Sequence, residues 1–264
     1  MSVLVDGSVS SASELLHAST PAAASNVTVM WWMFFDTDLN NFTSFLWFGR
    51  NSASGPFQAI YIGTGADGTN FEIWQDGARR DTGTLALVVS RWYHISMITQ
   101  LSPSAAFTCY LYDLTANSTT TRTGTWSATS PSHVADRTWF GNDPFVEVAD
   151  AWFANIKIWN TIQLTQAQIE EERWIVRAKN RRDLLWQEAP IYNTAALNDW
   201  SGNGRNYTTA GTVSSQNHAP ATWIRQRARY VMHPAAAGRT TRNTLVSPLG
   251  QYLGRGLWTH GGTG

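Results

Sequence analysis

The sequence has very few of the residues that mark secreted, membrane or metal-binding proteins. Cysteine occurs once in 264 residues, so no disulfide can form within the chain, and the apolar neighbours of Cys109 predict a buried thiol. The N-terminus has no basic segment followed by an apolar run, and no apolar run approaches the roughly 20 residues that cross a bilayer. The six His show neither H-E-x-x-H nor Cys/His spacing. We therefore expect no signal peptide, no membrane contact and no zinc site.

Charge is also scarce, and it is unevenly distributed. Charged residues make up 14% of the chain, and 19 bases balance 19 acids. Residues 1–199 hold all 19 acids and 12 bases, a net charge of 12 − 19 = −7, whereas residues 200–264 hold seven Arg and no acid, a net charge of +7. This asymmetry favours a C-terminal segment that contacts an acidic partner. The alternative is that the segment only neutralises its own body.

Apolar and aromatic residues are abundant. Hydrophobic residues make up 43% of the chain, and 14 residues are Trp, which is enough for a large core. The stretch Ala151–Trp159 alternates, with Trp152, Ile156 and Ile158 on one face. This period of two predicts a strand with a wholly apolar face.

A helix is predicted directly after this strand. Thr165 and Gln168 form a capping-box pattern, and Leu164 and Ile169 occupy the positions of a hydrophobic staple. Acids precede bases over 166–180, an order that complements the helix dipole. We therefore expect one helix over these residues.

Strand patterns separated by turn residues occur along the rest of the chain. Asp76-Gly77 is typical of a two-residue hairpin turn, and the polar run Thr115–Thr123 predicts an exposed loop. The other expected strands are Val27–Phe35, Phe45–Arg50, Gln58–Gly63, Asn70–Gln75, Thr84–Val89, Trp92–Gln100, Thr108–Leu114, Thr138–Gly141, Asp183–Gln187 and Tyr207–Val213. Short strands at this spacing with one helix predict an all-β, antiparallel two-sheet jelly-roll sandwich over residues 1–222.

Four segments resemble parts of laminin-G-like, concanavalin A-like lectin domains. Residues 153–169 (FANIKIWNTIQLTQAQI) resemble the last core strand and following helix of that family. The others are Asn26–Phe35 (NVTVMWWMFF), Arg91–Thr99 (RWYHISMIT) and the turn Asp199–Gly204 (DWSGNG). The resemblance implies the same jelly-roll fold, but such sandwiches serve as lectins, glycosidases, adhesion modules and virion parts.

A catalytic motif known from this fold is missing. Laminarinase-type glucanases with this fold carry E-x-D-x-x-E on one strand, which places a nucleophile and an acid on the same face. The nearest acidic pair here, Glu147 and Asp150, would point to opposite faces of a strand. We therefore predict that the protein is not an enzyme.

One sheet edge is a candidate binding site. Asn142, Asp143 and Asp150 are close in sequence there, and oxygen atoms are the ligands that Ca²⁺ takes. This edge is predicted to hold a glycan or calcium, and the alternative is turn chemistry at Asp143-Pro144. No other cofactor is expected. Exposed Trp and Tyr would also suit a sugar, although most Trp in alternating strands pack in the core.

Residues 223–264 show no strand or helix period and are predicted to form an extended arm. The arm has six Arg and no acid, and the planar guanidinium can hold carboxylates of a neighbouring subunit. Its Arg are diluted by Gly, Ala and Leu, so nucleic acid is not the expected partner. The residues expected to make the contacts are Arg225, Arg227, Arg229, Arg239, Arg242, Arg255 and Trp258.

Two functions remain open at this stage. The first is a structural protein of a large assembly, most concretely a bacteriophage virion component such as a capsid decoration or tail-associated protein, built in the host cytoplasm. Its arm would dock on other subunits of a homo-oligomer or capsid lattice. The alternative is a carbohydrate-binding lectin module for glycan recognition or adhesion.

Overall fold

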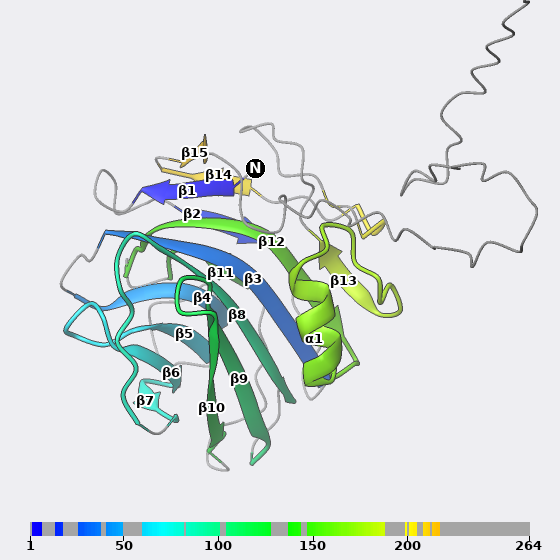
Figure 1. Cartoon of the computed structure of the whole chain (residues 1–264), viewed down its shortest axis with the longest axis horizontal. Helices are drawn as coiled ribbons and strands as arrows, with labels where there is room; N and C mark the ends of the chain where they lie inside the picture. The colour runs from blue at the N-terminus through cyan, green and yellow to red at the C-terminus, as the bar shows by residue number, and fades with distance from the viewer. Residues whose placement is uncertain are drawn as a thin grey trace, which may run out of the picture. The chain divides into compact units, whose positions relative to one another are not determined.

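The chain forms two antiparallel β-sheets packed face to face (Figure 1). The computed structural model describes residues 2–6, 14–17, 26–37, 41–49, 60–81, 83–100, 104–127, 137–143, 147–187, 199, 201–204, 208–211 and 213–216. Sheet A has the order β10 (Ser118–Thr125), β9 (Ala106–Asp113), β8 (Arg91–Gln100), β3 (Asn26–Thr37), β12 (Asp150–Asn160), β1 (Ser2–Asp6) and β15 (Val213–Gln216), and β13 (Leu184–Gln187) also pairs with β12. Sheet B has the order β14 (Thr208–Ala210), β2 (Glu14–His17), β11 (Arg137–Phe140), β4 (Thr43–Gly49), β5 (Ile60–Thr64), β6 (Phe71–Gln75) and β7 (Ala78–Arg79). The predicted jelly-roll sandwich is confirmed.

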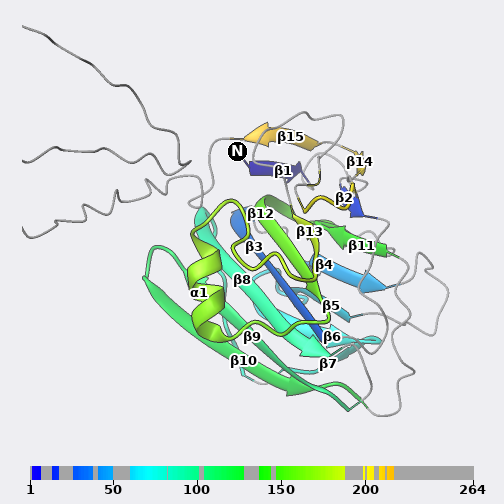
Figure 2. The ribbon, with the colours of Figure 1, turned by 90° about the vertical axis from the view of Figure 1, so that its right-hand side faces the viewer.

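The core lies between the two sheets. Alternate residues of β3, among them Val29 and Trp31, point inward and meet Leu46 and Ile62 of sheet B. The residues between them on β3, such as Trp32, face outward and are still buried. This explains why β3 is apolar on both faces: the outer face of sheet A is covered by α1 (Gln166–Arg173) and the segment after it (Figure 2).

Strand β12 forms as predicted, and Ile156 and Ile158 share the buried face, but the assignment of Trp152 to that face is wrong. Phe153 in the first half and Ile156 and Ile158 in the second half all join the inter-sheet core. Trp152 instead lies on the outer face, where its ring packs on Phe34 at a centroid distance of 4.6 Å. A bulge between Ala154 and Lys157 inserts one extra residue, and Asn155 there has φ of 51°. The extra residue reverses the alternation, as β-bulges do.

The capping box of α1 is confirmed, but the helix is shorter than predicted. Thr165 Oγ1 accepts a hydrogen bond from the N–H of Gln168, and α1 ends at Arg173. The Glu172 carboxylate then accepts the backbone N–H groups of Lys179 and Asn180 at 2.9 and 2.7 Å. These bonds turn the chain back beneath the helix, so the bases beyond Arg173 do not sit on α1.

A buried ion pair ties α1 to sheet A. Lys157 Nζ lies 3.1 Å from Glu172 Oε2, and both side chains are fully buried. The ammonium also donates to the carbonyls of Glu172 and Ile175 at 2.9 and 2.6 Å. Burial lowers the pKa of Lys157 to about 8, and the Glu172 charge opposes that shift. The pair connects the bulged strand, the helix and the return segment.

Several other predicted elements need correction. The polar run expected as a loop is mostly strand β10, and Thr84–Val89 contributes only an isolated bridge at Ala86. The segment Tyr207–Val213 divides between β14 in sheet B and β15 in sheet A. Strands β1 and β2 were not predicted. The Asp76-Gly77 turn is confirmed, with φ of 51° and 75° as a type I′ hairpin requires.

The predicted C-terminal arm lies outside the described residues. Residues 217–264, including the whole proposed arm and its Arg and Trp258 contacts, are not among them. Within the described residues, no helix has the length and apolar character needed to cross a membrane.

Candidate functional site

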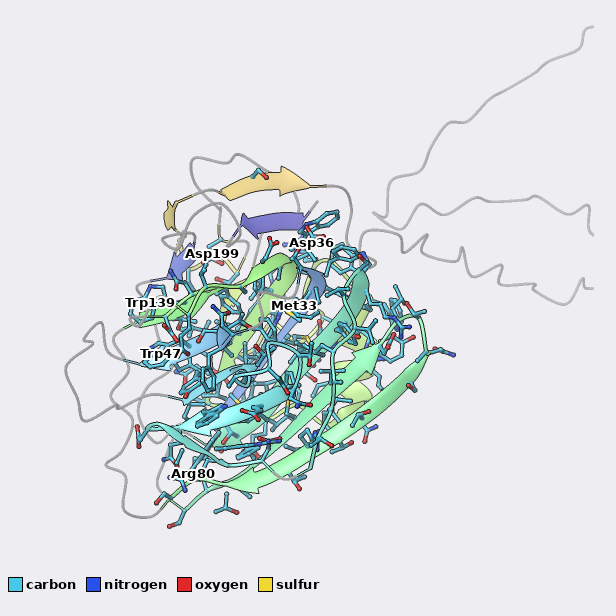
Figure 3. The ribbon with its side chains drawn as sticks, turned by 90° about the vertical axis from the view of Figure 1, so that its left-hand side faces the viewer. Met33, Asp36, Trp47, Arg80, Trp139 and Asp199 are labelled. Carbon is cyan, nitrogen blue, oxygen red and sulfur yellow. The ribbon has the colours of Figure 1, made fainter. Side chains whose placement is uncertain are left out.

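Sheet B carries a row of aromatic side chains on its outer face. Trp139 on β11, Trp47 on β4, Tyr61 on β5 and Trp74 on β6 lie opposite one another in the strand register. The residues beside them along the strands, such as Leu46, belong to the inter-sheet core, whereas Trp47 and Trp139 form a separate cluster with Tyr61. Figure 3 shows Trp47 and Trp139 beside each other. We call these four side chains the aromatic row.

The rings of the aromatic row are nearly parallel at its centre. Trp47 and Tyr61 stack at a centroid distance of 5.2 Å with 21° between their planes, and Tyr61 and Trp74 at 5.8 Å with 6°. Trp47 and Trp139 are 2% and 3% exposed, whereas Tyr61 and Trp74 are half-buried. A ligand arriving from solvent therefore meets Tyr61 and Trp74 first.

A polar row runs parallel to the aromatic row on the same face. Ser44 pairs with Gly63, and Gly63 pairs with Glu72, each two or three positions along its strand from a ring of the aromatic row. A Cβ atom at Gly63 would lie 1.9 Å from the carbonyl oxygen of Thr43. Because no side chain fits at Gly63, only backbone separates Ser44 from Glu72 on this face.

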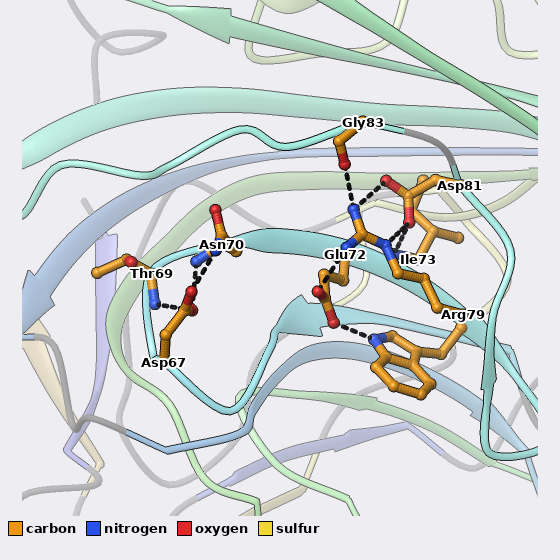
Figure 4. A network of polar contacts seen from close by, with 9 residues as sticks. Asp67, Thr69, Asn70, Glu72, Ile73, Arg79, Asp81 and Gly83 are labelled. Atoms are coloured by element: carbon orange, nitrogen blue, oxygen red, sulfur yellow. Dashed lines mark hydrogen bonds and ion pairs between the residues drawn. The ribbon is translucent and has the colours of Figure 1, made fainter.

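Glu72 is held firmly beside the aromatic row (Figure 4). Its Oε2 accepts the Trp74 indole N–H at 3.0 Å, and its Oε1 lies 2.7 Å from Arg79 Nη1. Arg79 in turn donates to both oxygens of Asp81 at 3.0 and 3.3 Å and to the carbonyl of Gly83. This network orients the carboxylate and the indole of Trp74 together.

Two carboxyl groups, those of Asp143 and Glu147, lie next to β4. Asp143 accepts hydrogen bonds through both oxygens, from the Ser44 hydroxyl at 2.6 Å and from the Glu147 N–H at 3.1 Å. The Glu147 carbonyl accepts the Ser44 N–H at 2.6 Å. Burial, followed by the Asp143 charge and a hydrogen bond with Asp143, raises the pKa of Glu147 to about 8. The raised pKa favours the neutral form of the Glu147 carboxyl.

The two rows meet at the phenol of Tyr61. Its pKa is raised, first by burial and then by the charges of Glu147, Asp143 and Glu72. All three carboxyls therefore act electrostatically on the Tyr61 hydroxyl. We call Glu72, Asp143 and Glu147 the acidic cluster, which adjoins the centre of the aromatic row.

The predicted edge residues end up on different sheets. Asn142 and Asp143 follow β11 of sheet B, where Asn142 Oδ1 accepts the Asp143 N–H at 2.9 Å, whereas Asp150 begins β12 in sheet A opposite Asp6. Asp143 interacts with Glu147. Sequence reasoning instead considered Glu147 together with Asp150, as the nearest acidic pair. Among the described residues, no group of three His, Cys, Asp or Glu converges to hold a metal ion. The calcium and glycan assignment of this edge stays a prediction.

Sequence reasoning missed the aromatic row and Glu72. The rings come from four strands between positions 47 and 139, and only their register brings them together. One local signal was present: Glu72 and Trp74 are two apart on a predicted strand, so they share a face. Their partners on β4, β5 and β11 could not be assigned from that spacing.

Comparisons with known proteins support the fold. No family model and no curated protein sequence matches the chain. The structure is similar to the enzymatically active domain of tailspike protein 2 from bacteriophage CBA120, with a TM-score of 0.50, 13% identity and coverage of 66% of this chain and 28% of that one. It is also similar to the heptameric SAP-like pentraxin of Limulus polyphemus, with a TM-score of 0.48, 13% identity and coverage of 81% and 93%. Mouse laminin alpha1 domains LG4-5 match with a TM-score of 0.40, 8% identity and coverage of 62% and 43%.

The tailspike match, with its TM-score of 0.50, supports the fold alone, an antiparallel jelly-roll sandwich like that of laminin-G-like, concanavalin A-like domains. At 13% identity over 28% of the tailspike chain, it carries the fold and not the tailspike's activity. The tailspike match does overturn the prediction that the protein is not an enzyme, because the tailspike domain that contains a similar sandwich is enzymatically active. The missing E-x-D-x-x-E motif therefore does not exclude catalysis.

Proposed function

We propose that the protein binds a carbohydrate chain across the outer face of sheet B, as a component of a bacteriophage virion. The observation that carries the proposal is the stacked aromatic row with the acidic cluster beside it. Aromatic side chains commonly line sugar sites, and the half-buried Tyr61 and Trp74 are the two rings of the row that solvent reaches. Carboxylates accept hydrogen bonds from sugar hydroxyls. Binding sites combine such apolar surfaces with a few fixed polar groups, and Glu72 is fixed by Arg79 and Trp74.

The virion part of the proposal draws on the fold and on the sequence. A bacteriophage tailspike contains a similar sandwich, and the Arg-rich segment 223–264 has the composition of an arm that docks on other subunits. Both that docking and a capsid or tail location are part of this proposal.

Removing one ring of the aromatic row should weaken glycan binding. We expect Trp74→Ala to raise the Kd about tenfold or more, because aromatic anchors at binding sites typically contribute above 1 kcal/mol and 1.4 kcal/mol is a factor of ten. The native protein is first screened for binding on an array of bacterial surface polysaccharides. The Kd of each variant for the polysaccharide that binds most tightly is then measured by calorimetric titration.

Trp92→Ala is the matched control, since Trp92 is a half-buried ring on the outer face of sheet A. It should leave the Kd unchanged. The proposal fails if the native protein binds no polysaccharide, or if Trp92→Ala weakens binding and Trp74→Ala does not.

Cleavage of the bound glycan is a second candidate function, favoured by the raised pKa of Glu147 beside Asp143 and Ser44. In hydrolysis, Glu147 would give its proton to the glycosidic oxygen as the C–O bond breaks, and water would add its hydroxyl to the anomeric carbon. The water proton would pass to Glu72, the other carboxylate of this face that is fixed by an ion pair.

Glu147→Gln should therefore reduce cleavage by about 10²- to 10⁴-fold, the usual contribution of a general acid. The native rate should fall as pH rises through about 8, because Glu147 then loses its proton. The rate of cleavage is measured as the release of reducing ends from the polysaccharide that the protein binds most tightly. Unchanged turnover in Glu147→Gln would exclude this role, and a binder that releases no reducing ends would leave binding as the function.

A further inference from the structure

Strand β10 (Ser118–Thr125) is an edge of sheet A (Figures 1 and 2). It pairs with β9 at eight consecutive positions, from Ser118 opposite Asp113 to Thr125 opposite Ala106, without a register shift. On its other side, the described residues provide only an isolated bridge between Asp81 and Gly124. Along most of β10, the outward N–H and C=O groups thus have no strand partner within the described part of the chain.

The other described sheet edges are much shorter. Strand β7 has two residues, β14 three and β15 four. Strand β7 also carries Arg79 in ion pairs with Glu72 and Asp81. Short edges and charged side chains are the usual protection against pairing with another chain. Strand β10 has eight residues, no Pro, no bulge and no exposed charged side chain, so it lacks these protections.

The side chains of β10 are neutral wherever they are exposed. Its one charged residue, Arg122, is 7% exposed, and its guanidinium lies close to Gly83. The exposed residues all carry hydroxyl groups: Ser118, Thr119, Thr120, Thr121, Thr123 and Thr125. Cross-strand Thr pairs are favourable, whereas like charges placed opposite each other repel. The edge is therefore compatible with a second copy of itself.

We infer that β10 is a homodimer interface, in which β10 of one copy pairs antiparallel with β10 of a second copy and joins two A sheets into one. Antiparallel self-pairing about a twofold axis uses both free edges at once and closes the assembly. Addition of an unrelated strand would leave a new free edge behind it. The interface lies on sheet A and is independent of the aromatic row of sheet B.

Sedimentation of the full-length protein over a range of concentrations tests the inference. We expect the native chain to shift from monomer to dimer as concentration rises, and Thr119→Lys with Thr121→Lys to remain monomeric because of charge repulsion between the two copies. Ala66→Lys with Gln163→Lys is the charge-matched control at exposed positions outside β10, and it should dimerise like the native chain. A native chain that stays monomeric, or a dimer that survives both β10 substitutions, overturns the inference.

Disulfide trapping tests the pairing itself without introducing charge. Cys109 is the only native cysteine and is fully buried, so a cysteine placed on β10 is the one accessible thiol. Single substitutions Thr119→Cys, Thr121→Cys and Thr123→Cys should give a covalent dimer on mild oxidation at the position nearest the twofold axis, and Ala66→Cys, an exposed position between β5 and β6, should give none. Equal cross-linking of Ala66→Cys and all three β10 variants would contradict an ordered β10 pairing.

Discussion

Replacing Lys157 by Met should lower the free energy of unfolding by about 3–5 kcal/mol, the cost of removing one partner of a buried ion pair. Lys157 and Glu172 are both fully buried, so the substitution leaves the Glu172 carboxylate without its cation in a medium that solvates charge poorly. The same ammonium holds the Ile175 carbonyl at 2.6 Å, and the segment after α1 would lose that bond too. Denaturant unfolding of the two proteins measures the difference.

The matched control for this substitution is Lys179→Met. Lys179 pairs with Glu171, but their side chains are 61% and 49% exposed, and exposed pairs contribute at most about 1 kcal/mol. We expect the control to unfold within that margin of the native protein. Equal stabilities for Lys157→Met and Lys179→Met would show that the buried pair does not anchor α1.

Replacing Ile156 by Ala should cost about 2–5 kcal/mol, the range found when a large aliphatic side chain is deleted from a packed core. Ile156 is fully buried and belongs to the inter-sheet cluster, with residues of both sheets. It is also the first inward residue after the bulge, so it anchors the shifted register of β12. Thermal and denaturant unfolding both report the loss.

A graded pair of variants separates packing from general damage. Ile156→Val should cost only about 0.5–1.5 kcal/mol. Val88→Ala should change stability by less than about 0.5 kcal/mol, because Val88 is 43% exposed. If Ile156→Ala unfolds like Val88→Ala, then Ile156 does not face the core and the register described for β12 is wrong.

The bulge at Asn155 shows where pattern reasoning has its limit. Strict alternation places Trp152, Ile156 and Ile158 on one face, and this was the prediction. A period of two holds only while each residue pairs with one partner, and the bulge adds a residue that has none. Asn155 adopts φ of 51°, a conformation that Asn tolerates better than most residues, but Asn alone does not announce a bulge.

Strand β10 was missed for a related reason. Sequence patterns detect strands through a buried face, and six of the eight residues of β10 are exposed hydroxyl-bearing residues. The polar run therefore predicted a loop. Strand β10 forms because its backbone pairs with β9. Such backbone pairing does not depend on side-chain polarity, so the polarity pattern does not reveal it.

The sequence by itself determined the strands with an apolar face, the hairpin turn at Asp76-Gly77, the start of α1 and the class of sandwich. These features depend on residues a few positions apart, and local propensity, turn geometry and capping act over that distance. Only the tertiary structure decided which strands are neighbours and in what register. That register aligns Trp139, Trp47, Tyr61 and Trp74 into one row and brings Asp143 to Ser44. Contacts between distant segments are set by the packing of the whole core, so the candidate site could not be assembled from spacing along the chain.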